Sequence, residues 1–186
     1  MKTAGQCVLT FLFCYITLGL ALPYALLFSI IDLFLDLGKH RRGPVYIPSR
    51  VTHEPYSAIM VALGVATVLS LILRSLKLLD LTLIEVLILG TYVGVKHWLL
   101  DIATVPGAYV NGRLLYLTVL RDDGWYSTAT CLIATLLLFL KLRNIWLLPI
   151  LLPLSLEPNV YLPIIAVLYV IDLIVKAILH VSLFFH

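Results

Sequence analysis

The sequence is poor in charged residues, and this shortage argues against an ordinary soluble domain. Charged side chains make up 12% of the 186 residues and hydrophobic ones 62%, against about 25% and about 45–50% in soluble proteins. The mean hydropathy of +1.07 agrees with this imbalance. We therefore expect an integral protein of the cell membrane, with membrane lipids as its immediate partners.

Cysteine and basic runs are also scarce. Cys7, Cys14 and Cys131 share no C-x-x-C spacing, which argues against a disulfide framework and favours buried, small apolar side chains. The net charge is only +3, so nothing indicates nucleic acid as a partner. Internal repeats and low-complexity linkers are absent too. One membrane domain over residues 1–186 is expected, either alone or in a homo-oligomer or larger membrane complex.

Long apolar runs occupy most of the sequence. Polar and apolar residues rarely alternate in them, so membrane helices are predicted rather than barrel strands. A helix needs about 20 mainly apolar residues to cross a bilayer, and apolar runs cover residues 8–35, 56–73, 78–100, 126–140 and 160–185, with a shorter one at 145–156. The predicted fold is all-α: a polytopic helical membrane protein with about five transmembrane helices plus a short or re-entrant segment.

The first apolar run is long for a single helix and contains Pro23. Either one tilted, kinked span or a helix followed by a short re-entrant piece fits it. Its beginning resembles a secretory signal, but the apolar character continues through Leu35, and we interpret it as the first membrane helix. Basic residues cluster in the following loop, residues 36–55, which favours a cytoplasmic position for that loop.

Five polar residues lie at or near the ends of apolar runs: Asp36, His40, His53, His97 and Asp101. The spacing of His97 and Asp101 places both on one helical face. The end of the first span, the start of the second and the end of the third lie at the same membrane face, so these residues can meet. Imidazole and carboxylate ligands suit zinc best, and also iron or manganese. By itself, His97 beside Trp98 also fits an interfacial aromatic belt.

The order of these residues resembles a known family. Asp36 and His40, then Thr52-His53, then Gly90, His97, Asp101, Thr104 and Gly107 look like the LexA-regulated inner-membrane metal-dependent hydrolase family (YdjM-like) and its archaeal relatives of unknown function. The resemblance covers about residues 30–113. It implies a metal-dependent hydrolase. The family's Ser after Thr-His is Glu54 here, and its His near the N-terminus is missing.

Further residues would complete such a site. Glu54 or Asp32 could act as general base, or as an outer partner that orients a ligand. Arg50, Arg42 or Arg113 could hold the phosphate or carboxylate of an anionic substrate. A site at the membrane interface favours a phosphoester or lipid-linked substrate, although the substrate itself stays unknown.

A second polar line runs along the last span, where Asp172, Lys176 and His180 share one helical face. Asp172 and Lys176 are predicted to form an ion pair, with Glu85 as a further partner. The line could pair helices, form a proton or ion path, or build a second wall of the metal site. The alternatives to a hydrolase are thus a small membrane transporter or channel, or an accessory subunit without catalysis.

Overall fold

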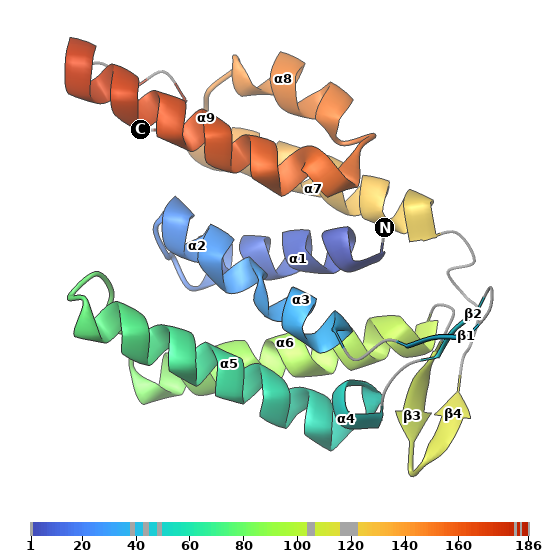
Figure 1. Ribbon diagram of the computed structural model, residues 1–186. Coiled ribbons are helices and arrows are strands. Elements are labelled where there is room, and N and C mark those ends of the chain that lie inside the picture. Colours follow the sequence, from blue (N-terminus) through green and yellow to red (C-terminus); the bar gives the residue numbers. More distant parts are fainter. Residues whose placement is uncertain are drawn as a thin grey trace.

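The computed structural model describes residues 2–37, 40–42, 45–47, 50–103, 107–115, 123–180, 182 and 184–185. Helices dominate these residues, as predicted (Figure 1). The elements follow in the order α1 (Lys2–Leu12), the π-helical turn η1 (Phe13–Thr17), α2 (Leu22–Ser29), α3 (Ile31–Asp36), β1 (His40–Arg42), β2 (Val45–Ile47), α4 (Arg50–His53), α5 (Pro55–Ser75), α6 (Leu83–Ala103), β3 (Ala108–Val110), β4 (Arg113–Leu115), α7 (Asp123–Leu142), α8 (Leu147–Leu154) and α9 (Pro158–Leu179).

The first apolar run folds as a helical hairpin. The chain turns after η1 through Gly19, whose φ of +66° suits glycine, and Pro23 lies in the first turn of α2, where its missing N–H costs nothing. Thr3 at the start of α1 hydrogen-bonds Asp36 at the end of α3, so α2 and α3 return along α1. Of the two predicted arrangements, the structure has the helix with a returning piece, and the single kinked span is wrong.

Within the described part of the chain, four helices are long and apolar enough to cross a membrane: Pro55–Ser75, Leu83–Ala103, Trp125–Leu142 and Pro158–Leu179. They correspond to the four later predicted spans. α5 and α9 begin with a proline, which is favoured at the first helical position. Large apolar side chains such as Leu71 and Ile72 are exposed on these helices, as expected for surfaces that face lipid. The α1–α3 hairpin lies between the α5–α6 pair and the α7–α9 group (Figure 1).

The α5–α6 pair is tightly packed because small residues line its contact. A Cβ on Gly94 would lie 2.5 Å from the Cα of Ile59, and one on Gly90 would lie 2.7 Å from the Cα of Leu63. Gly90 and Gly94 thus form a G-x-x-x-G pair that lets two helix backbones approach closely. α6 carries two residues of the polar cluster described below, and a third lies at the end of α4, directly before α5, so this packing helps to fix their separation.

We expect Gly94→Ala to destabilise the protein by about 1–3 kcal/mol, since the added methyl group meets the backbone of α5. Thermal unfolding in detergent measures the loss. Gly64→Ala is the matched control on α5, because no atom lies within 4 Å of a Cβ there. That variant should unfold at the same temperature or slightly higher, as alanine favours a helix over glycine. Equal unfolding temperatures for the two variants would contradict the tight-packing interpretation.

The second polar line does not form the predicted pairs. Lys176 and His180 are exposed, and Lys176 makes no ion pair with Asp172 among the described contacts. Asp172 instead accepts hydrogen bonds from Ser182 Oγ and from the backbone N–H of Phe184, each at 2.7 Å. The physical reason is that the chain folds back after α9 and brings donors that compete with Lys176.

Glu85 is likewise not a partner of Asp172. It is half-buried, and its carboxylate accepts hydrogen bonds at 2.7 Å from both the backbone N–H and the hydroxyl of Thr82. The N–H of Glu85 is in turn 3.3 Å from the Thr82 hydroxyl. This capping box explains why α6 begins here.

Candidate metal centre

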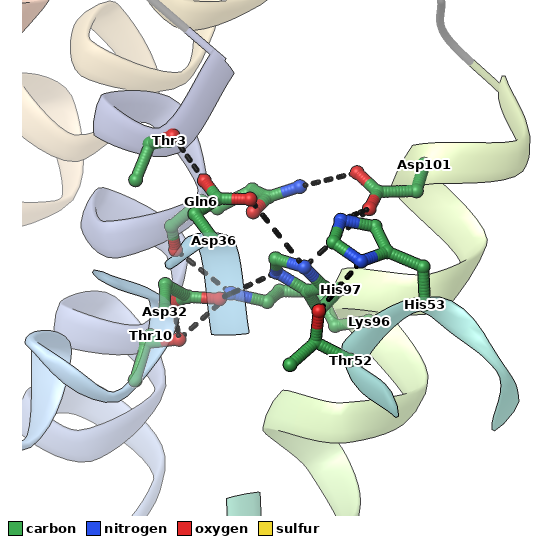
Figure 2. A network of polar contacts seen from close by, with 10 residues as sticks. All are labelled: Thr3, Gln6, Thr10, Asp32, Asp36, Thr52, His53, Lys96, His97 and Asp101. Atoms are coloured by element: carbon green, nitrogen blue, oxygen red, sulfur yellow. Dashed lines mark hydrogen bonds and ion pairs between the residues drawn. The ribbon is translucent and has the colours of Figure 1, made fainter. Parts of the chain in front are cut away.

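Asp36, His53, His97 and Asp101 come together at one end of the bundle. α3 ends at Asp36, α4 ends at His53, and α6 carries His97 and Asp101 one turn apart near its own end. One ligand atom from each residue lies within 4.8 Å of those of the other three. Figure 2 shows the side chains converging from these separate helices. Both histidines and Asp101 are fully buried.

The distances within this cluster suit a metal ion. His53 Nε2 lies 3.0 Å from Asp101 Oδ2, and His97 Nε2 lies 3.4 Å from the same oxygen and 3.6 Å from Asp36 Oδ1. Four ligands that hold zinc tetrahedrally at about 2.0–2.1 Å are separated by about 3.3 Å from one another. Two imidazoles and two carboxylates also form a donor set that zinc, iron and manganese accept.

The His97 ring gives the strongest indication of a bound cation in the cluster. Neither of its ring nitrogens makes a hydrogen bond within the described part of the chain, although carboxylate oxygens lie 3.4–3.6 Å away. Buried polar groups nearly always have a hydrogen-bond partner or an ion. A cation between His97 Nε2 and the oxygens of Asp36 and Asp101 would satisfy these three groups at once, and Nδ1 would remain facing Asp32.

Three polar residues hold the ligands in place from outside. Thr52 Oγ1 is 2.7 Å from His53 Nδ1, which leaves Nε2 of that ring facing Asp101. Gln6 Nε2 donates to Asp101 Oδ1 at 3.2 Å, and the Thr3 hydroxyl donates to Asp36. Such partners fix the orientation of metal ligands.

Thr52→Val should weaken zinc binding about 10–100-fold without preventing it, because the His53 ring loses the group that orients it. Thr67→Val is the matched control, since Thr67 is exposed on α5 and away from the cluster. Competition with a chromogenic zinc chelator gives both affinities. A Thr52→Val affinity equal to that of the control would show that Thr52 has no part in ligand orientation.

Lys96 is a part of the site that the sequence analysis missed. It is almost fully buried, and its Nζ lies 2.7 and 2.8 Å from the two oxygens of Asp32. The same ammonium donates to the carbonyl of Gln6 and the hydroxyl of Thr10, both at 2.8 Å. The available signal was a lysine inside an apolar span, directly before His97, since such charges are rare without a partner.

Asp32 is engaged with Lys96 and also faces the metal cluster. Its Oδ1 lies 3.5 Å from His97 Nδ1, on the side of the ring opposite Asp101. Asp32 is fully buried and accepts a further hydrogen bond from Thr10 at 2.6 Å. Of the two roles predicted for it, orienting a ligand fits these contacts better than proton transfer does.

The remaining predicted residues lie around the cluster or outside the described part. Glu54 is half-buried directly after His53, and its Oε1 accepts a hydrogen bond from the N–H of Gly112 at 3.2 Å. Arg113 follows in β4 and is exposed. Four further predicted residues cannot be placed in the site. The side chains of His40, Arg42 and Arg50 lie outside the described part of the structure, and so does the whole of Thr104, which belongs to the family pattern.

The chain matches no family model, no curated protein and no solved structure in comparisons with each.

Proposed function

We propose that this chain is a membrane-embedded, divalent-metal-dependent hydrolase with its active site at the membrane interface. The observation that carries the proposal is the convergence of Asp36, His53, His97 and Asp101 at the end of apolar helices. Keeping two carboxylates and two imidazoles together inside a membrane protein is costly unless they have a function. The order of these residues, which resembles the inner-membrane metal-dependent hydrolases, supports the same reaction class.

Zinc is the best candidate metal, with iron and manganese as alternatives. Such an ion lowers the pKa of a water molecule to about 7 and polarises a phosphoryl or carbonyl oxygen. Asp36, His53, His97 and Asp101 would hold it, and Asp32 would orient His97 through its second ring nitrogen. His40 would be a further ligand, as the sequence order predicts.

Glu54 is the candidate general base. It adjoins the ligand His53 and, unlike both histidines and Asp101, it is not fully buried, so it can exchange protons with water. The exposed Arg113 lies next to Gly112, which donates to Glu54, and a guanidinium there would attract an anionic headgroup. Arg42 and Arg50 would contribute further positive charge. A site at the membrane interface with positive charge around it favours a phosphoester or lipid-linked substrate.

Hydrolysis of phosphate-bearing lipids tests the proposal. The purified protein in detergent is given phosphatidic acid and an isoprenyl pyrophosphate, and released phosphate is measured with and without added zinc. We expect release that a chelator stops and zinc restores. Glu54→Gln should lower kcat about 10²–10⁴-fold while the metal content stays unchanged, and Glu157→Gln, at an exposed glutamate before α9, should leave kcat unaltered. Release that survives the chelator would contradict the proposal, and no release from either lipid would favour an accessory subunit.

A further inference from the structure

An apolar cavity lies beside the metal cluster and is not part of it. It has a volume of about 390 Å³ and lies between α1, the α2–α3 segment and the first half of α9. Its walls are mainly apolar, with Ala4 from α1, Leu26 and Leu33 from α2 and α3, and Leu162 and Ala166 from α9. This volume falls in the range of about 300–1,000 Å³ that ligand pockets have.

Thr3 connects the cavity to the metal cluster. The residue lines the cavity, and its hydroxyl donates a hydrogen bond to Asp36, one of the four clustered residues. The cavity therefore ends one side chain away from the cluster. Figure 2 shows Thr3 and Asp36 together on the α1 side of the network. An apolar cavity that adjoins a group of metal-binding side chains matches an amphiphile with one apolar and one polar end.

We propose that this cavity holds a hydrocarbon chain of a phosphate-bearing lipid whose headgroup lies at the metal cluster. This inference rests on the proposed function, because the cluster supplies the polar end. Lipid tails are as apolar as leucine, so the cavity gains little affinity from apolar contact alone within a membrane. Its effect is positional: it selects where the chain lies, and the headgroup supplies the binding energy.

Photolabelling maps the chain directly. The protein is placed in lipid nanodiscs with phosphatidic acid that carries a diazirine in one acyl chain, and labelled residues are identified by mass spectrometry. We expect Leu33 and Leu162 of the cavity to be labelled several-fold more than Leu71 and Ile72, which are exposed on α5. Diacylglycerol with the same diazirine lacks the phosphate and should show no such preference.

Filling the cavity gives the second arm of the test. Ala166→Trp should reduce labelling of Leu33 and Leu162 several-fold, whereas Val167→Trp, at the next and exposed position of α9, should not. Leu26→Trp fills the cavity from the opposite wall, in case Ala166→Trp fails to elute as a single helical species. Uniform labelling, equal labelling by diacylglycerol, or labelling unchanged by both cavity variants would overturn the proposal.

The outcomes separate this inference from the proposed function. The metal content of the same preparations reports on the cluster, independently of where the lipid chain lies. Bound metal without selective labelling contradicts the lipid-chain site alone. Selective labelling by phosphatidic acid without bound metal contradicts the metal centre and supports a lipid-binding protein with a polar headgroup site.

Discussion

Replacing Lys96 by methionine is expected to destabilise the protein by about 3–5 kcal/mol, the usual cost of breaking a buried ion pair. Lys96 Nζ contacts both oxygens of the fully buried Asp32. Without the ammonium, the carboxylate keeps the Thr10 hydroxyl as its one hydrogen-bond donor among the described residues and faces the ring of His97. Thermal unfolding and chemical denaturation in the same detergent measure the loss.

Two variants show whether the effect belongs to the pair. Lys176→Met removes an exposed lysine from α9 and should change stability by less than about 0.5 kcal/mol. The double variant Asp32→Leu with Lys96→Met removes both charges and should recover much of the lost stability, because no buried charge is left unpaired. If Lys96→Met is as stable as Lys176→Met, the buried Asp32–Lys96 pair does not stabilise the fold, contrary to what its contacts indicate.

Zinc is expected to stabilise the protein, and His97→Ala is expected to abolish that stabilisation. A ligand that binds only the folded state at 100 times its Kd adds about 2.7 kcal/mol. His97 contributes Nε2, which lies between Asp36 and Asp101, so its loss opens the centre of the cluster. The difference in unfolding temperature with and without zinc measures the effect in each variant.

His180→Ala is the matched control for that comparison. His180 is exposed at the end of α9, about 30 Å of helix away from Pro158, which lines the cavity beside the cluster. This variant should keep the full zinc-dependent shift. An undiminished shift in His97→Ala would mean that zinc binds elsewhere on the protein.

Hydropathy predicted the four later spans because run length alone decides whether a helix can cross a bilayer. The meeting of Asp36, His53 and His97 also followed from the sequence. Consecutive spans alternate in direction, so the end of the first apolar run, the start of the second and the end of the third lie at the same membrane face. The direction of α1 could not be deduced in this way. Its return as a hairpin places Thr3 and Gln6 beside the cluster, whereas one kinked span would have placed them at the opposite face.

The sequence also could not predict which side chains pair between helices that are distant along the chain. Lys96 was visible as a charge in an apolar run, but only the packing of α6 on the hairpin identifies Asp32 as its partner. The predicted Asp172–Lys176 pair failed for a related reason. Residue spacing along one helix says nothing about the donors of Ser182 and Phe184 that fold back onto Asp172.

Metal content is the most direct test of the metal centre. The natural sequence, His97→Ala and His180→Ala are each produced in cells grown with ample zinc, iron and manganese and purified in detergent. Mass spectrometry then measures the metal content of each protein. We expect about one metal ion per chain in the natural sequence and in His180→Ala, and almost none in His97→Ala. Metal-free protein in all three samples, or equal metal in all three, would contradict this expectation.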